Sequence, residues 1–295
     1  MVQFGLRAHD FGKQPAQQLA EQLSVCQIAS IQLALAKAIT DSPAATGEMS
    51  CGYARRIGSI FAKRQIAISV LGCYINPVHP DKDLRELSLR RFEEHLRFAR
   101  DFGCAIVGTE TGSCNADCSF HPDTSNEKTF ELFLRSIERL IKTAEAYGTI
   151  IGIEPVAGQH TIDSVEKLAR VFSILDSPNL QTIYDPVNLL PWDPLPEPDN
   201  TILAHPSSKA QQLFFDHAFD VLNERIVAIH LKDFTYMNGH KQGNLCALTG
   251  WMDTPLFLKT LIRRKPYIDV LLENTHPSLV TSTLEKLKRI VLEIS

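Results

Sequence analysis

The sequence predicts a closed (β/α)8 barrel, a TIM barrel, formed as a single domain over residues 1–295. Short apolar runs alternate with longer stretches of helical period along the whole chain, which is typical of a parallel sheet covered by helices. Eight such runs can be counted, so one strand-helix unit takes about 37 residues, a normal length for this barrel. The alternative is an open doubly wound sheet with a nucleotide site. It would need a glycine-rich turn after the first run, where the sequence is Ala8-His9-Asp10-Phe11-Gly12.

Each predicted strand is a run of apolar, often β-branched residues, as expected for strands that are buried on both faces. In chain order the strands are Val2–Ala8, Val25–Leu33, Ile66–Gly72, Ala105–Glu110, Ile150–Glu154, Gln181–Asp185, Ile226–Leu231 and Ile268–Glu273. In a closed barrel their carboxyl ends gather at one face, and that face carries the active site.

Helix signals lie between these runs. Leu84–Phe102 places Leu and Phe at three- and four-residue spacing and stops before Gly103, and Phe130–Tyr147 repeats the pattern before Gly148. Glycine is favoured just after the last residue of a helix, so both segments are predicted helices. The segment Thr161–Glu166 contains Ser and Asp side chains that predict the capped start of a third helix.

Two longer segments interrupt the alternation. Thr111–Asn126 is rich in Ser, Cys, Asp and Asn, and Pro186–Pro206 holds six prolines and Trp192. Both follow the carboxyl end of a predicted strand, so both are expected to border the active site. Trp192 has two interpretations: it covers bound substrate as part of a lid, or it packs the proline-rich segment against the barrel.

The last four predicted strands end on side chains that bind metals well, namely Glu154, Asp185, His230 and Glu273. The intervals between them are 31, 45 and 43 residues, each close to one strand-helix unit, so a barrel would bring them together. Three buried carboxylates beside one imidazole need a compensating cation, because desolvating unpaired charge costs several kcal/mol per group. We therefore predict one divalent ion, Mn²⁺, Co²⁺, Mg²⁺ or Zn²⁺, on these four residues. The alternative is that each acid caps a helix or pairs with a nearby base.

Other polar residues lie near the same predicted face. Glu110 ends the fourth strand and His9 follows the first, so both are candidate substrate contacts. For His9 the alternative is a loop residue exposed to water. Asp253 precedes a predicted helix and is interpreted as its N-cap.

Four stretches surround the predicted ligands: Ile153-Glu154-Pro155, Tyr184-Asp185-Pro186-Val187-Asn188, Ile229-His230-Leu231-Lys232-Asp233 and Leu271-Leu272-Glu273-Asn274. Taken in this order, they resemble the sugar phosphate isomerase/epimerase family. These xylose isomerase-like barrels include ketohexose 3-epimerases, hydroxypyruvate isomerase and inosose dehydratase. The resemblance covers most of the chain and is clearest from Gly148 to His276.

The resemblance implies a divalent-metal-dependent isomerase or epimerase of a small sugar or sugar phosphate, with the metal on the four predicted ligands. It also implies that Glu154 and Glu273 exchange protons with the substrate carbon from opposite sides, through a metal-stabilised cis-enediolate. An inosose dehydratase-like lyase is a close alternative. Because family members often assemble, a homodimer or homotetramer is expected.

The chain departs from the family pattern at Asn188, where the epimerases usually carry His three residues after the metal-binding Asp. Asn188 is suited to bind a substrate hydroxyl but not to act as the same acid or ligand, so the substrate stays open. Lys232 follows His230 by two residues and shares its strand face. It is a candidate to hold a hydroxyl or phosphate, and an ion-pair residue is the alternative.

Composition narrows the remaining classes. The formal net charge is −4 and no run of five or six like charges occurs, so a nucleic-acid partner is not expected. An endonuclease IV-like repair nuclease would need a basic face and further His ligands. A non-catalytic sugar-binding barrel is the other alternative. We expect a cytoplasmic protein without a membrane span, because the N-terminus lacks a secretory signal and the longest apolar run, Ile66–Ile75, is too short.

The seven cysteines are odd in number and scattered, so we expect free thiols rather than a disulfide framework. Cys114, Cys118 and His121 form the spacing C-x3-C-x2-H, which hints at zinc. A structural zinc site normally has four ligands, and no fourth is evident here.

Overall fold

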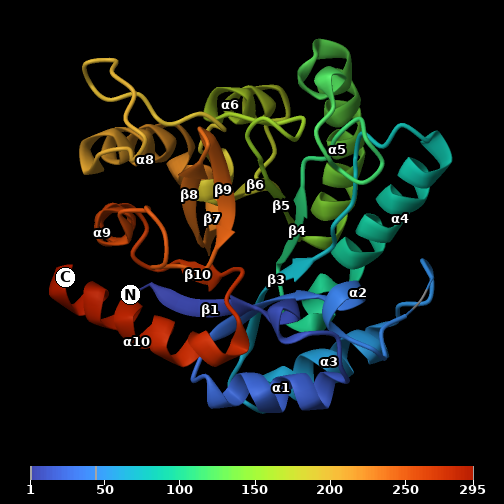
Figure 1. Cartoon of the computed structure of the whole chain (residues 1–295). Coiled ribbons are helices and arrows are strands. Elements are labelled where there is room, and N and C mark those ends of the chain that lie inside the picture. The colour runs from blue at the N-terminus through green and yellow to red at the C-terminus, as the bar shows by residue number, and fades with distance from the viewer. Residues whose placement is uncertain (1, 44, 295) are drawn as a thin grey trace.

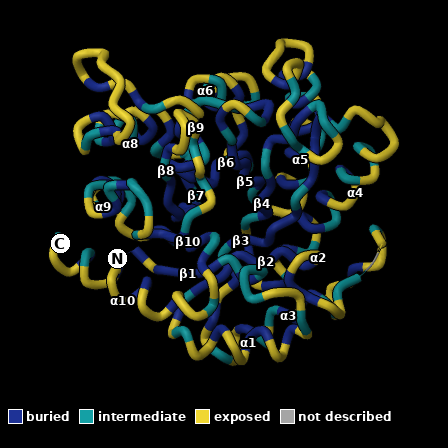
Figure 2. Tube along the Cα trace, in the orientation of Figure 1, coloured by how far each residue is buried: buried dark blue, intermediate teal, exposed yellow. Residues whose placement is uncertain are grey.

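The computed structural model describes residues 2–43 and 45–294, so residues 1, 44 and 295 of the predicted domain lie outside the described part. Eight parallel strands close into a barrel in the order β1-β10-β7-β6-β5-β4-β3-β2, which confirms the predicted (β/α)8 fold. Figure 1 shows the strands at the centre with the helices around them, and Figure 2 shows that the buried part of the trace follows the strands. The barrel strands are β1 (Gln3–Arg7), β2 (Ser30–Ala34), β3 (Ala67–Gly72), β4 (Ile106–Glu110), β5 (Ile150–Glu154), β6 (Leu180–Tyr184), β7 (Ile226–Leu231) and β10 (Asp269–Leu272).

Only the start of the second strand differs from its prediction by more than one residue. The predicted run began at Val25, but Ala16–Val25 forms helix α1 and the strand starts at Ser30. Leu19 and Leu23, one helical turn apart, are buried under this helix. Val25 is the last residue of this helix and is 78% exposed, so the predicted strand had included the end of a helix.

The helices around the barrel begin and end largely where the sequence indicates. The predicted helix before Gly103 is α4 (Lys82–Phe98) followed by a short 3-10 turn (Ala99–Phe102). Gly103 and Gly148 both have left-handed backbone conformations, with φ of 78° and 60°. Ser164 and Asp253 cap the helices that follow them, as predicted. The remaining helices are α2 (Leu35–Ala38), α3 (Cys51–Ala62), α5 (Glu127–Tyr147), α6 (Val165–Ile174), α7 (Pro186–Leu189), α8 (Ser208–Leu222), α9 (Thr254–Arg264) and α10 (Pro277–Ile294). Among the described residues, no helix is both long and apolar enough to cross a membrane.

A β-hairpin after β7 was not predicted. Strands β8 (Asp233–Met237) and β9 (His240–Leu245) pair antiparallel, outside the barrel sheet. The turn between them is Asn238-Gly239, and both residues have positive φ, 52° and 79°. Asn-Gly is the strongest short-range hairpin signal because both central residues of such a turn need that conformation. The sequence therefore carries a local signal for this hairpin, which the strand prediction overlooked.

The interior of the barrel is filled by a small apolar layer, made of Val70, Ile183, Ala228 and Leu271. Gly108 and Gly152, on β4 and β5, leave the space that Ile183 occupies. A Cβ added at Gly108 would lie 2.8 Å from Ile183, and one added at Gly152 would lie 3.0 Å from it. This packing makes the barrel centre a solid core and leaves the carboxyl ends of the strands for polar groups.

Candidate metal centre

The candidate site lies next to the apolar layer, two residues further along each strand toward its carboxyl end. Side chains on a strand alternate with a period of two, so the next inward positions after Ile183, Ala228 and Leu271 are two residues further along. These positions are Asp185, His230 and Glu273. The same step from Gly108 and Gly152 gives Glu110 and Glu154. The barrel thus places a polar layer directly on its hydrophobic one.

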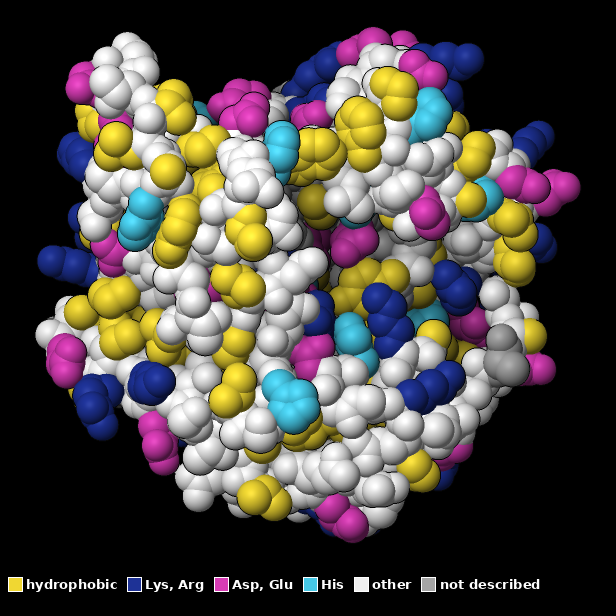
Figure 3. Space-filling model, viewed as in Figure 1, with side chains coloured by type: hydrophobic (Ala, Val, Ile, Leu, Met, Phe, Trp, Pro, Cys, Tyr) yellow, Lys and Arg dark blue, Asp and Glu magenta, His cyan; other side chains and the backbone are white. Residues whose placement is uncertain are grey.

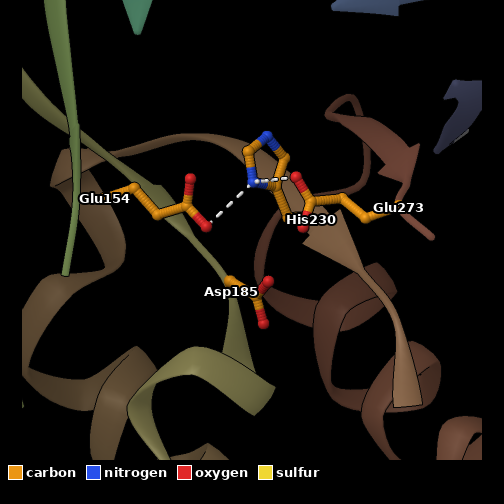
Figure 4. Close-up of side chains that lie close together, drawn as sticks. All are labelled: Glu154, Asp185, His230 and Glu273. Carbon is orange, nitrogen blue, oxygen red and sulfur yellow. Dashed lines mark ion pairs between the residues drawn. The ribbon is translucent and has the colours of Figure 1, made fainter. Parts of the chain in front are cut away.

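Four side chains of this layer converge, as Figure 4 shows: Glu154, Asp185, His230 and Glu273. One potential ligand atom from each lies within 4.8 Å of those of the others, and all four side chains are buried. His230 Nδ1 is 3.1 Å from Glu154 Oε1 and 3.3 Å from Glu273 Oε1. Three carboxylates and one imidazole nitrogen are a mixed donor set of the kind that holds Mn²⁺, Co²⁺, Mg²⁺ or Zn²⁺.

The orientation of His230 is set by Gln32 on β2. His230 Nε2 is hydrogen bonded to Gln32 Oε1, and because a carbonyl oxygen only accepts, Nε2 is the donor. In a neutral ring Nδ1 then carries a lone pair directed at two carboxylates, which is favourable only with a cation between them. Without a cation the ring takes up a second proton. Burial opposes this, but Glu154 and Glu273 outweigh it and raise the pKa of His230 to about 9.

Two cationic side chains touch the same carboxylates. Lys232 Nζ lies 2.9 Å from Asp185 Oδ2 and 3.1 Å from Glu273 Oε2, and an Arg7 nitrogen lies 3.2 Å from Glu273 Oε1. The sequence suggested that the carboxylates need a metal ion as their counter-charge. The structure shows that the chain itself supplies two positive charges beside them, Arg7 and Lys232. The alternative, that an acid pairs with a nearby base, holds for Asp185 and Glu273.

Helix α7 connects two members of the cluster. Asp185 is its N-cap, with Oδ1 accepting from the Asn188 backbone N–H at 2.9 Å. The Asn188 side chain reaches back and donates from Nδ2 to Glu154 Oε1 at 2.6 Å. Asp185 is thus both a helix cap and a member of the cluster, and Asn188 is bonded to a predicted ligand in this structure.

The surroundings move the pKa values of the two glutamates in opposite directions. Burial raises the pKa of Glu154 and outweighs the opposing effect of His230, and Glu273 and Asp185 add to the rise. Burial also disfavours the Glu273 carboxylate, but Lys232, His230 and Arg7 outweigh it and hold its pKa well below the usual range. One environment favours a carboxylic acid and the other a carboxylate.

The remaining predicted contacts lie around the carboxyl face of the barrel. Glu110 is partly exposed, with His160 Nε2 at 3.9 Å from its carboxylate. His9 is partly buried rather than a freely exposed loop residue, and its ring stands edge-on to Tyr74 with centroids 6.0 Å apart. Burial lowers the pKa of His9 to about 3. Figure 3 shows a hollow near the middle of the molecule that contains acidic, basic and histidine side chains.

Trp192 contacts two neighbouring loops. Its ring lies 5.4 Å from that of Phe120, measured between centroids, and it packs on Gly158, where an added Cβ would come within 2.9 Å of it. The side chain remains 40% exposed. Packing of the proline-rich segment is therefore observed, and the exposed part leaves the proposed lid role open to test.

The cysteine motif does not assemble into a ligand set. Cys114 Sγ lies 3.3 Å from Thr129 Oγ1, and His121 Nδ1 accepts from the Asp123 backbone N–H at 3.1 Å. Within residues 2–43 and 45–294, the group at the strand ends is the one with ligand geometry.

Three members of the polar layer were missed by sequence reasoning: Arg7, Gln32 and Tyr74. Arg7 and Gln32 each follow an inward small residue, Gly5 and Ser30, by two positions, and Gln32 Nε2 donates to Tyr74 Oη at 2.6 Å. The period-two rule that indicated the later strand ends would have indicated Arg7 and Gln32 as well.

Fold and site together define a (β/α)8 barrel with a carboxylate-histidine cluster at its carboxyl face, where barrel active sites lie. A family model described as xylose isomerase-like TIM barrel matches residues 29–290. The chain therefore belongs to this family, as the sequence resemblance indicated. No curated protein sequence matches the chain.

Solved structures agree with this assignment. A D-tagatose 3-epimerase-like protein has a TM-score of 0.70 at 16% identity, covering 99% of this chain and 98% of its own. The 3-keto-D-glucoside 4-epimerase YcjR from E. coli has a TM-score of 0.68 at 13% identity, covering 98% of this chain and 100% of its own. The IolI protein, solved with a zinc atom, has a TM-score of 0.67 at 12% identity, covering 99% and 98%. At these identities the likeness shows the fold.

Proposed function

We propose that the chain is a divalent-metal-dependent isomerase or epimerase of a small sugar or sugar phosphate. The observation that carries the proposal is the convergence of Glu154, Asp185, His230 and Glu273 with ligand atoms within 4.8 Å of one another in a buried layer. The hydrogen bond from His230 to Gln32 supports it, because it leaves Nδ1 directed at the carboxylates, as a metal-binding histidine is usually held.

A divalent ion held by these four side chains would act as a Lewis acid that stabilises negative charge on the oxygen atoms of a carbonyl substrate. Mn²⁺, Co²⁺, Mg²⁺ and Zn²⁺ all suit the donor set. Two similar structures, one solved with a zinc atom and one in complex with magnesium, are consistent with such an ion.

The two glutamates are the proposed proton-transfer groups. Figure 4 shows Glu154 and Glu273 approaching His230 from two sides. A carboxylate on each side of a carbon next to a carbonyl is suited to remove a proton from one face and return one to the other, or to the next carbon. One of the similar structures is a 3-keto-D-glucoside 4-epimerase, whose keto sugar derivative fits this class of substrate. A dehydratase would use the same first proton transfer.

The other predicted site residues are proposed to bind the substrate. Glu110, His9 and Trp192 are proposed to contact substrate around the carboxyl face. Lys232 and Asn188, which bind the carboxylates in this structure, are proposed to turn to substrate hydroxyl or phosphate oxygens when a metal takes their place. A small carbohydrate is thus the proposed partner, acted on by a homodimer or homotetramer.

Proton exchange tests the proposal without knowledge of the product. The protein, loaded with Mn²⁺ or Co²⁺, is incubated in D2O with a panel of ketoses. The deuterium content of each sugar is then measured by mass spectrometry. We expect one sugar to gain one deuterium, and Glu154→Gln and Glu273→Gln to slow the gain by at least about a hundredfold. Glu131→Gln, an exposed glutamate on α5, is the matched control. No exchange with any sugar, or undiminished exchange in both variants, would overturn the proton-transfer mechanism.

One observation favours a second candidate, a non-catalytic sugar-binding barrel. Arg7 and Lys232 already compensate the carboxylates, so the cluster is electrostatically viable without a metal. Elemental analysis separates the two candidates, because a binding barrel would retain less than one metal ion per chain after loading and would still bind sugar.

A further inference from the structure

Helix α7 is a short support for the candidate site, and its two ends are buried. It has four residues, Pro186–Leu189, yet it carries Asp185 at its N-cap and Asn188 in its last turn. A helix of one turn makes few bonds of its own and leaves its final carbonyl groups without helical donors. The position of Asp185 and Asn188 therefore depends on what holds this helix from outside.

Lys241, on strand β9 of the hairpin, supplies donors to these carbonyl groups. Its Nζ donates to Val187 O at 2.8 Å, to Asn188 O at 3.3 Å and to Leu190 O. The last carbonyl groups of a helix carry partial negative charge, and the N–H groups of a lysine side chain at this end can bind them. Lys241 thus binds two carbonyl groups of the helix and one directly after it; Asn188 O also accepts from the Ala157 backbone N–H at 2.9 Å, so Lys241 shares that acceptor.

Other hairpin contacts hold the chain around α7. The backbone N–H of Lys241 donates to Trp192 O at 3.0 Å, and Tyr236 Oη donates to Pro191 O at 3.3 Å and Asp193 O at 3.1 Å. Gly243 packs against Val187, where an added Cβ would lie 3.1 Å from a side-chain methyl. The hairpin is therefore in contact with the helix and with the segment that follows it.

We propose that Lys241 is a positioning residue that fixes α7, and through it the placement of Asp185 and Asn188 in the metal centre. The inference rests on the proposed function only in the test that measures Mn²⁺ affinity. The contact path is continuous: Lys241 binds the α7 carbonyls, Asn188 binds Glu154, and Asp185 binds the Asn188 N–H. Within the described part of the chain, the hydrogen bonds of the Lys241 side chain go to these carbonyl groups and not to the four predicted ligands, so its proposed action passes through the helix.

The first test is amide hydrogen exchange, which needs no metal. The N–H groups of Leu189 and Leu190 donate to Asp185 O and Pro186 O, and they report directly on α7. We expect Lys241→Met to speed exchange in the peptide covering residues 186–193 by about tenfold or more. Gln242→Met, an exposed neighbour on the same strand, is the matched control and leaves exchange unchanged. Unchanged exchange in the Lys241 variant overturns the inference.

The second test is Mn²⁺ affinity by calorimetry. Outer partners of metal ligands typically change affinity by about 10- to 100-fold, so we expect a rise in Kd of about tenfold for Lys241→Met. Tyr236→Phe, which loses only the bonds to the segment after α7, keeps the wild-type Kd within about twofold. An equal loss in Tyr236→Phe overturns the special role of Lys241 in favour of the hairpin as a whole.

Two further cases need a separate treatment: an unstable Lys241→Met variant, and a wild type that binds no Mn²⁺. If Lys241→Met melts cooperatively at a much lower temperature, Lys241→Gln replaces it, with an expected effect between wild type and Met, and an effect no larger than that of the control overturns the inference. If the wild type binds no Mn²⁺, the proposed function fails, while the exchange experiment still decides whether Lys241 fixes α7.

Discussion

His230 Nε2 is hydrogen bonded to Gln32 Oε1, so a side chain from β2 orients the single imidazole of a cluster whose other members lie at the carboxyl ends of β5, β6 and β10. The bond crosses the barrel interior, since β10 and β1 separate β7 from β2 in the ring. The first half of the barrel, which carries no predicted metal ligand, therefore helps to orient a ligand of the second half.

Replacing Gln32 with Leu is expected to weaken Mn²⁺ binding by about tenfold, because the His230 ring loses the acceptor that fixes its tautomer. Gln32→Glu keeps an acceptor at the same place and is expected to retain the wild-type affinity or exceed it. Isothermal titration with Mn²⁺ measures both. A Leu variant that binds as tightly as the wild type would show that Gln32 does not orient the ring.

Lys232 is expected to compete with the metal for Asp185 and Glu273. In Lys232→Met, the metal-free protein should lose about 3 kcal/mol of unfolding free energy, because buried carboxylates are left unpaired. Mn²⁺ should then raise the melting temperature more in this variant than in the wild type. Calorimetric melting with and without Mn²⁺ checks this, with Lys286→Met, an exposed lysine, as control. An identical rise in melting temperature with Mn²⁺ in variant and wild type would contradict the competition of Lys232 and the metal for the same carboxylates.

Gly108 is required by the packing of the barrel core. Its missing Cβ would lie 2.8 Å from both Ile183 and Val70, so Gly108→Ala is expected to cost about 1–3 kcal/mol. Adding Ile183→Val removes one of the two clashes and should recover part of that loss. Urea unfolding of the two single variants and the double variant gives the interaction energy. Simple additivity of the two single effects would contradict this packing.

The stability of the fold should depend on pH through His95 on α4. This side chain is buried with Nδ1 at 2.8 Å from Arg91 O, and burial lowers its pKa to about 4. The unfolded chain takes up the proton near pH 6.5, before the folded one does, so the contribution of neutral His95 is present above pH 6.5 and lost as the pH falls toward 4.

The size of this effect follows from the shift in pKa. The loss amounts to roughly 3 kcal/mol by pH 4. In His95→Gln the acid decline of unfolding free energy should be shallower by that amount, as measured by urea unfolding between pH 7.5 and 4. Parallel declines in variant and wild type would show that His95 does not contribute.

The fold and the four candidate ligands were open to prediction because both depend on local pattern. Apolar runs ended by Glu154 or Glu273 indicate a buried strand with a polar end, and a closed parallel barrel converts neighbouring strand ends into one site. Asp185 shows the limit of such patterns. Its one carboxylate is a helix cap and a member of the cluster at once, so the two interpretations were not exclusive.

Arg7 and Lys241 mark two different reasons for what was missed. Arg7 follows Gly5 by two positions, and applying the strand period to the first strand would have placed it in the polar layer. Lys241 carries no such signal. The Asn238-Gly239 pair indicates a hairpin, but where that hairpin docks is decided by packing against α7, which lies more than 40 residues earlier in the chain.

The central claim is that Glu154, Asp185, His230 and Glu273 form one divalent metal site. Counting bound Mn²⁺ per chain by elemental analysis after equilibrium dialysis, for the wild type and for His230→Ala, tests it most directly. We predict one ion per wild-type chain and a loss of that ion in the variant, with folding confirmed by circular dichroism. Less than one ion in the wild type, or undiminished binding in His230→Ala, would contradict it.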